Sequence, residues 1–341
     1  MNYDAVLILS FGGPERRDEV IPFLENVLRG KNVPRERMLQ VAEHYYHFAG
    51  RSPINGQNRA LIAALRAELA ARGPALPVYW GNRNWHPLLA DTLRQMQADG
   101  VRRALAFATS AFGSYSGCRQ YFEDIERARA EVGQDAPEVH KLRTFHNHPA
   151  FLEAAAAQLG LALDQVPAER RGAARIVFTA HSVPLSMAAS SPYVAQLEEA
   201  CAMVCKILGL PSWTLVYQSR SGPPTQPWLE PDINDHLRQL AAAGVTDVVA
   251  IPIGFLSDHM EVIYDLDTEA AALSRQLGLN FYRAPTVGSH PAFVSMLREL
   301  ILERTEEAPR RALGVLGPGP DFCAADCCAL PARPTRSAAA P

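Results

Sequence analysis

The stretch RIVFTAHSVP, residues 175–184, contains the pattern that decides the fold. The apolar, β-branched run from Arg175 to His181 predicts a buried strand, and the residues up to Pro184 predict a turn directly after it. In open α/β sheets, ligands bind beyond the carboxyl ends of the strands. His181 therefore stands where a ligand-binding crevice is expected, and a histidine that is only hydrogen-bonded within the turn is the alternative.

Five further runs of this kind predict strands, and longer helical patterns separate them. The runs cover residues 5–11, 78–81, 104–109, 214–218 and 248–255. Apolar residues at three- and four-residue spacing predict helices over 59–72, 87–98 and 193–208, the last ending at Gly209. Strands that alternate with helices are typical of parallel sheets built from βα units.

The strand runs fall into two groups, which predicts an α/β protein with two doubly wound, parallel-sheet domains of similar size. We place the domains at residues 1–145 and 146–290. Residues 291–307 predict a helix that returns to the first domain. From residue 308 to residue 341 the composition changes to Pro, Gly, Ala and Arg, and the periodicity is lost. We expect this tail to be disordered unless something ties it down.

The bulk composition excludes several classes of protein. The 341 residues include 33 basic and 36 acidic side chains, and 48% are hydrophobic. No stretch concentrates Lys and Arg, so nucleic acid is not an expected partner. No apolar run approaches the roughly 20 residues of a membrane span, and residues 1–11 lack the pattern of a signal peptide. We therefore expect a cytoplasmic protein with reduced or metal-ligating cysteines, and peripheral membrane contact stays open.

A row of carboxylates follows the last strand run. Glu261, Asp265 and Glu269 are four residues apart, which stacks them along one face of a helix. Like charges at that spacing repel, so the row costs stability unless a cation or a proton offsets the repulsion. A proton or metal path is therefore one interpretation, and a solvated acidic face is the other. Asp258 and His259 precede the row, either as polar groups at its mouth or as a helix cap.

Several motifs together resemble the ferrochelatase family. They are LSFGGP at 9–14, GRSPIN at 50–55, HSVP at 181–184, QSRSGPPTQPWLEP at 218–231 and SDHMEVIYDLD at 257–267. Their order and approximate spacing match the family over about residues 3–305. The resemblance implies two Rossmann-like domains with a porphyrin cleft between them. It also implies an enzyme of haem biosynthesis that inserts ferrous iron into a bent porphyrin ring.

The resemblance implies roles for four of the polar residues. His181 and Glu261 are the expected catalytic pair and the expected contacts of the ferrous iron, with Glu261 across the ring from His181. A neutral imidazole suits the removal of pyrrole protons, because its ordinary pKa lies near neutrality. Asp265 and Glu269 continue a proton or metal path. Imidazole and carboxylate bind ferrous iron moderately, whereas a thiolate cage would hold it too tightly to transfer.

The resemblance also places residues near the macrocycle or its propionates. They are Phe11, Arg29, Ser52 and Tyr121, with Arg119 as a further candidate. Core packing is the alternative for the two aromatic residues, and a helix-terminal or surface charge is the alternative for the arginines. The motifs LSFGGP, PFLENV at 22–27 and YSGCRQY at 115–121 resemble the actinobacterial enzymes, which act on coproporphyrin III. That substrate has four propionates, whereas protoporphyrin IX has two.

The cysteines predict a second metal site. Three of them lie within six residues of the tail, at Cys323, Cys327 and Cys328. Thiols at that density suggest an iron-sulfur cluster or zinc. The resemblance implies a [2Fe-2S] cluster with Cys118 as the internal fourth ligand, although the C-x-x-x-C-C spacing does not match residue by residue. Cys201 and Cys205 are the rival pair, and their helical spacing favours core packing.

Other functions remain as alternatives. The porphyrin could be protoporphyrin IX, or the chain could carry porphyrin or haem without catalysis. Related chelatases insert cobalt or nickel, but they usually have histidines where this chain has carboxylates. A nucleotide-binding Rossmann enzyme is excluded, because residues 10–14 lack the G-x-G-x-x-G spacing. The expected partners are the porphyrin, ferrous iron and other enzymes of the haem pathway.

Overall fold

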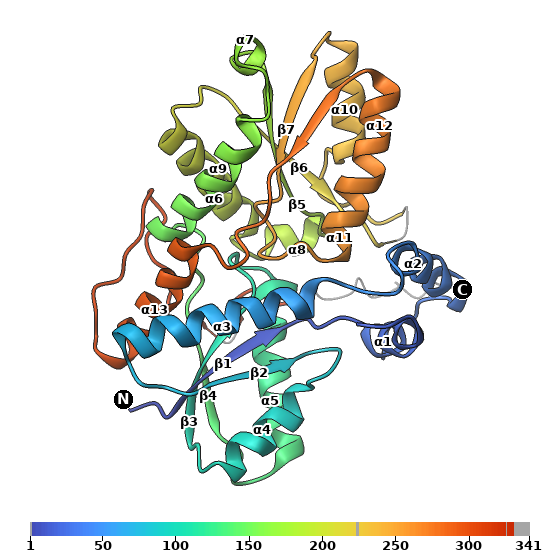
Figure 1. The fold of residues 1–341 in the computed structure, drawn as a ribbon. Helices are drawn as coiled ribbons and strands as arrows, with labels where there is room; N and C mark the ends of the chain where they lie inside the picture. Colours follow the sequence, from blue (N-terminus) through green and yellow to red (C-terminus); the bar gives the residue numbers. More distant parts are fainter. Residues whose placement is uncertain (1, 223–224, 325, 331–341) are drawn as a thin grey trace, which may run out of the picture.

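Two parallel sheets form the framework of the protein. The computed structural model describes residues 2–222, 225–324 and 326–330 (Figure 1). The first sheet has the order β2-β1-β3-β4 and the second the order β6-β5-β7-β8. The strands are β1 (Ala5–Ser10), β2 (Val78–Asn82), β3 (Arg103–Ala108), β4 (Glu138–Lys141), β5 (Arg175–His181), β6 (Thr214–Gln218), β7 (Asp247–Ile251) and β8 (Asn280–Arg283). The predicted α/β class with two parallel-sheet domains is confirmed.

The sequence patterns missed two strands and extended a third. The edge strands β4 and β8 have the sequences EVHK and NFYR, whose mainly half-buried residues give no apolar run. The run 248–255 predicted a longer strand than β7, which ends at Ile251. Pro252 follows and has no N–H to donate to the ladder. The remaining apolar residues of that run therefore form the turn that leads to the carboxylate row.

Some of the described α-helices pack on both faces of the two sheets, and others lie outside them. The helices are α1 (Val20–Val27), α2 (Arg35–His47), α3 (Ile54–Arg72), α4 (Leu89–Ala98), α5 (Gln120–Val132), α6 (Pro149–Leu163), α7 (Ala168–Arg171), α8 (Leu185–Ala189), α9 (Tyr193–Leu208), α10 (Ile233–Ala242), α11 (Met260–Val262), α12 (Ala271–Leu277) and α13 (Pro291–Thr305). Within the described residues, no helix is both long enough and apolar enough to cross a membrane.

The two faces of each sheet belong to different cores. Alternate strand residues pack against α4 and α5 on one side of the first sheet and against α3 on the other. The second sheet packs against α10, α12 and the segment between α11 and α12 on one side, and against α6 and α9 on the other. The inner cores merge into one cluster, and α13 lies against both α3 and α6. One continuous core therefore joins the two domains.

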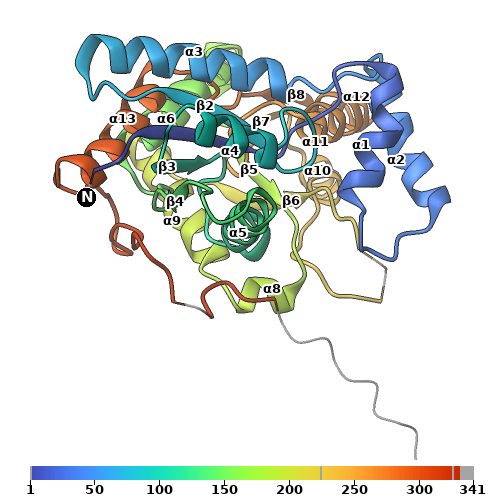
Figure 2. The ribbon, with the colours of Figure 1, turned by 90° about the horizontal axis from the view of Figure 1, so that it is seen from below.

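The tail is held against the body by side chains of both domains. We call residues 308–324 and 326–330 the strap. Arg143, which forms a buried ion pair with Glu303, donates a hydrogen bond to Arg311 O at 2.9 Å. Glu199 on α9 accepts the N–H groups of Val315 and Leu316 at 2.6 and 2.9 Å. The strap runs from α13 towards α8 (Figure 2). The tail is thus tied down over these residues, and 331–341 lie outside the described part.

Candidate active site

His181 is fixed at the carboxyl end of β5 by its neighbours. Tyr193 Oη donates to His181 O at 3.0 Å, and Ser182 N donates to Gln218 O on β6 at 2.8 Å. The ring atom His181 Nδ1 lies 2.5 Å from Ser182 O. A carbonyl only accepts, so this contact assigns the proton to Nδ1 and leaves the lone pair on Nε2. His181 Nε2 is the atom available for chemistry.

Glu261 lies directly opposite this nitrogen. Its carboxylate oxygen is 3.6 Å from His181 Nε2, and the two side chains are 47% and 31% exposed. His259 caps α11 by accepting Glu261 N–H at 3.2 Å, and Gln218 Nε2 donates to Glu261 O at 2.7 Å. Three chain segments therefore converge on one pair. Of the two interpretations of His259, the structure shows the helix cap.

Asp258 is part of an ion-pair cluster beside the site. Arg283 on β8 donates to Asp258 at 2.6 Å and to Asp267 at 2.7 Å. Asp258 N–H also donates to Gln57 Oε1 on α3 at 2.9 Å. Asp258 therefore links the turn before α11 to β8 and to the first domain.

The carboxylate row continues on a π-helix. Residues Ile263–Ala270 form this helix, in place of the α-helix that the four-residue spacing predicted. Thr268 Oγ1 donates to Ile263 O, five residues back, at 3.3 Å. Such segments are rare and occur frequently at functional sites. Asp265 and Glu269 still lie close enough to Glu261 or to each other for their charges to interact.

The pKa values of the facing pair move in opposite directions. Burial lowers the pKa of His181, but the charge and hydrogen bond of Glu261 outweigh it, so the net pKa lies above the ordinary value. Burial raises the pKa of Glu261, yet the His181 charge holds it at about 2. Both shifts describe one attraction, in which the carboxylate stabilises a proton on the imidazole. Glu261 therefore strengthens His181 as a base.

Asp265 has the opposite environment. Burial raises its pKa to about 7, aided by the charges of Glu261 and Glu269, although a hydrogen bond from Ser219 opposes the shift. Burial and the charge of Asp232 also raise the pKa of Glu269. A carboxyl that titrates near pH 7 can exchange protons under ordinary conditions. The row is therefore suited to carrying protons away from His181 or to binding a cation.

The four residues expected near the substrate lie in different environments. Phe11 is half-buried and packs edge-on against Phe23 at 6.2 Å, and Arg29 is exposed just after α1. Ser52 is 5% exposed beneath Gly13. Tyr121 is 4% exposed in the core of the first domain, with the Arg83 guanidinium 3.9 Å from its ring. Phe11 and Arg29 are thus at least partly exposed, whereas Ser52 and Tyr121 are buried, and their contact with a substrate stays a prediction.

The structure adds residues that the sequence patterns did not indicate. His44 on α2 stacks on Tyr264 of the π-helix, with ring centroids 3.7 Å apart and an angle of 7°. Burial and the charge of Glu261 raise the pKa of Tyr45. Helix α2 of the first domain therefore reaches the carboxylate row of the second (Figure 1). The aromatic run HYYHF at 44–48 was the available signal.

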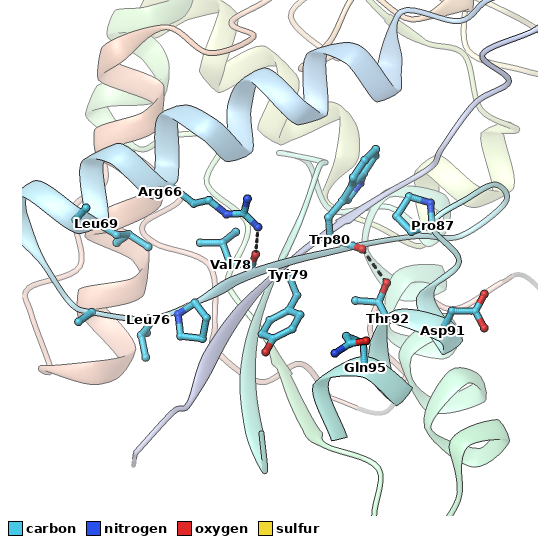
Figure 3. A pocket seen from close by; sticks show the side chains of 13 residues that line it. Arg66, Leu69, Leu76, Val78, Tyr79, Trp80, Pro87, Asp91, Thr92 and Gln95 are labelled. Carbon is cyan, nitrogen blue, oxygen red and sulfur yellow. Dashed lines mark hydrogen bonds between the residues drawn. The ribbon is translucent and has the colours of Figure 1, made fainter. Parts of the chain in front are cut away.

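Two hollows lie on the surface of the described part of the chain. One has a volume of about 250 Å³ and adjoins the His181 turn. Its lining includes Ser182, Tyr217, Arg220 and Asp232. The other, of about 770 Å³, lies over β2 between α3 and α4 (Figure 3). Its lining contains none of the predicted site residues. We therefore assign the chemistry to the region around His181 despite the larger size of the second hollow.

Three of the four predicted cluster ligands lie in the strap, and the fourth, Cys118, lies in the first domain. Cys118 is 5% exposed, and Lys141 Nζ donates to its sulfur at 3.2 Å. The Cys323 thiol, together with the charge of Lys141, lowers the pKa of Cys118 to about 5, although burial opposes the shift. Cys327 Sγ and Cys328 Sγ lie 3.7 Å apart. Cys327 and Cys328 thus form a close pair within the strap.

The rival cysteines behave as core residues. Cys201 and Cys205 are 0% and 2% exposed, and burial raises the pKa of both thiols. Across residues 2–222, 225–324 and 326–330, no three or more His, Cys, Asp or Glu side chains are arranged to hold a single metal ion. The paired thiols at the strap therefore do not form a preassembled mononuclear site.

Comparisons with known proteins agree on one family. The chain matches the family model described as Ferrochelatase over residues 3–305. A protein named Ferrochelatase from Rhodopirellula baltica is 55% identical, covering 97% of this chain and 95% of that protein. One named Coproporphyrin III ferrochelatase from Nocardia farcinica is 52% identical, covering 98% and 99%. Another of that name from Streptomyces coelicolor is 50% identical, covering 99% and 96%.

A solved structure shares the architecture at low sequence identity. SirB from Bacillus subtilis with Fe3+ has a TM-score of 0.56 and is 13% identical, covering 90% of this chain and 98% of that chain. This likeness supports the fold and carries no conclusion about the reaction.

Proposed function

The chain belongs to the ferrochelatase family, and from this premise we propose that it inserts ferrous iron into coproporphyrin III, giving coprohaem in haem biosynthesis. The relatives from Nocardia farcinica and Streptomyces coelicolor bear the name of that reaction. The observation that carries the proposal is the contact between His181 Nε2 and Glu261 at the carboxyl end of β5. A base with a facing carboxylate is what removal of pyrrole protons requires.

His181 and Glu261 divide the work at the ring. His181 Nε2 accepts a pyrrole proton, and the charge of Glu261 stabilises the imidazolium that results. Asp265 titrates near pH 7, so it takes protons onward towards Glu269 and the solvent. The carboxylate oxygens of Glu261, Asp265 and Glu269 also suit the incoming ferrous ion, which is the second substrate.

The distance between the pair limits how the ring binds. At 3.6 Å the two side chains contact each other, so no macrocycle fits between them in this arrangement. Placement of Glu261 across the ring from His181 therefore requires the two side chains to separate when the porphyrin enters. The side chains of His181 and Glu261 are both partly exposed, which leaves room for that movement.

The cysteines support a [2Fe-2S] cluster as the cofactor. A cluster of this type takes four thiolates, two on each iron. The chain supplies the four thiols, and Cys327 and Cys328 already lie as a pair 3.7 Å apart, as two ligands of one iron would. Cys118, Cys323, Cys327 and Cys328 would hold the group, and it would supply a one-electron centre beside the strap.

The proposal is tested by an anaerobic assay of the purified protein with ferrous iron. Coproporphyrin III and protoporphyrin IX are offered separately, and loss of the free-base visible spectrum is followed. We expect preferential loss of coproporphyrin III, and no insertion by a folded His181→Ala variant. Preference for protoporphyrin IX would overturn the substrate, and near-normal turnover by the variant would overturn the role of His181.

A non-catalytic carrier is the rival function. Folded protein that binds porphyrin but inserts iron into neither substrate would favour it. A cytoplasmic location, contacts with a membrane surface and contacts with other haem-pathway enzymes stay predictions from the sequence.

A further inference from the structure

The Cys118 sulfur has a cationic neighbour that the proposed reaction does not use. Lys141 is the last residue of β4, and its ammonium donates to Cys118 Sγ at 3.2 Å. Lys141 is one of three lysines in the chain, with Lys31 and Lys206, among 33 basic residues. Within the described part of the chain it forms no ion pair with a carboxylate. Its charge is thus directed at the thiol and not neutralised locally.

The other charge next to Cys118 is partly balanced. Arg119 follows Cys118 in the chain, and its guanidinium forms an ion pair with Glu123 at 3.1 Å. Lys141 comes instead from the adjacent edge strand, whose position is set by its ladder with β3, where Lys141 pairs with Ala106. The β-sheet therefore fixes the backbone position of Lys141 independently of the strap that carries the other three cysteines.

We propose that Lys141 is a positioning residue of the iron-sulfur site, which directs the Cys118 sulfur and raises the reduction potential of the cluster. The inference rests on the proposed cluster. Reduction adds one negative charge, and a hydrogen-bonded cation at a ligand sulfur stabilises the reduced form more than the oxidised form. A compact ammonium provides this as a point charge, and its three donors rotate freely to meet a sulfur.

The test measures the cluster itself and not iron insertion. Iron and acid-labile sulfide are first determined in the wild-type protein, purified anaerobically, and the midpoint potential is then measured by spectroelectrochemical titration. The variants are Lys141→Met, Lys141→Arg and the control Lys206→Met, which removes an equal charge from an exposed site on α9. A protein without iron and sulfide would overturn the cluster, and with it this inference.

With the cluster present, we expect Lys141→Met to lower the midpoint potential. A tenfold lower ratio of reduced to oxidised cluster at fixed potential corresponds to about 59 mV for one electron. Lys141→Arg keeps the charge, so its midpoint potential should stay close to that of the wild type. The midpoint potential of Lys206→Met should equal that of the wild type. Loss of the cluster in Lys141→Met with retention in Lys141→Arg also supports the role. An unchanged potential, or equal effects of Met and Arg, would overturn it.

Discussion

The residues to which we assign the chemistry, His181 and Glu261, lie at or after the ends of strands of the second sheet. His181 and Glu261 could be singled out from the sequence because each follows an apolar strand run, and ligand sites in parallel sheets lie at such positions. Their direct contact at 3.6 Å could not be predicted, because it depends on the turn that replaces the end of the predicted strand. The stacking of His44 on Tyr264 was also missed, because it joins residues of two domains that lie far apart in the sequence.

Replacement of Glu261 by Gln tests the coupling of the pair. Glu261 raises the pKa of His181, so its loss lets burial dominate and the pKa falls. The imidazole then stays neutral to lower pH, and the acidic limb of the insertion rate profile should shift to lower pH. We expect the maximal rate to fall by about tenfold or more, because the imidazolium loses its stabilising partner.

The matched control is Glu269→Gln. Glu269 lies further along the row and is not among the main causes of the pKa shift of His181. Its acidic limb should coincide with that of the wild type. An unshifted limb in Glu261→Gln, or an equal shift in both variants, would contradict direct coupling between Glu261 and His181.

At the scale of elements, periodicity predicted the buried strands and helices but not the irregular ones. β1, β5 and β6 each contain a run of apolar residues, so their patterns were clear. β4 and β8 are polar edges, and their pairing depends on neighbours far away in the chain. The π-helix has no signature in a four-residue spacing, because that spacing also fits an α-helix.

The approach of the β7 turn to β5 is close enough to be tested. A Cβ on Gly254 would lie 2.7 Å from Cα and Cβ of Ala180, the residue before His181. Gly254→Ala must therefore shift one strand end. We expect a loss of about 1–3 kcal/mol in the free energy of unfolding, together with slower insertion, measured by urea unfolding and the anaerobic assay.

Gly160→Ala provides the comparison for this prediction. A Cβ at Gly160, within α6, meets no atom within 4 Å. Alanine there should stabilise the protein by about 0.5–1 kcal/mol, because it lowers the entropy of the unfolded chain. Equal stability of the two variants would show that the contact with Ala180 is not restrictive.

At the scale of the whole molecule, the strap and the shared core hold the domains in one arrangement. The composition of the tail predicted disorder unless something tied it down. The ties are Arg143, Asn147 and Glu199, which lie up to 170 residues away in sequence. Gly314 has a φ of 83°, and a Cβ there would overlap Glu199. Local composition carries no information about such partners.

Glu199→Ala should release the strap. Burial raises the pKa of Glu199, but the N–H groups of Leu316 and Val315 outweigh it, so folding lowers the pKa. The stabilisation is therefore present above the ordinary pKa of the carboxyl and is lost as the pH falls through the folded value. We expect a loss of about 1–3 kcal/mol at pH 7, and a smaller difference in acid.

Hydrogen exchange at the amides of Val315 and Leu316 locates this effect. Both amides should exchange faster in Glu199→Ala, and iron content should fall if the strap holds the cluster. Glu198→Ala, an exposed neighbour on the same helix, is the control and should behave as the wild type. Unchanged protection of both amides in Glu199→Ala would contradict the anchoring role.

The open edge of the first sheet has a consequence for self-association. β2 is an outer strand, and an outer strand offers unpaired carbonyls to any other extended chain. Two of these carbonyls are already taken, by Arg66 at Val78 O (2.6 Å) and by Thr92 at Trp80 O (2.7 Å). A second molecule would have to displace both side chains before it could add a strand. These two hydrogen bonds therefore oppose the addition of further strands at β2, although the hollow beside it is open to solvent.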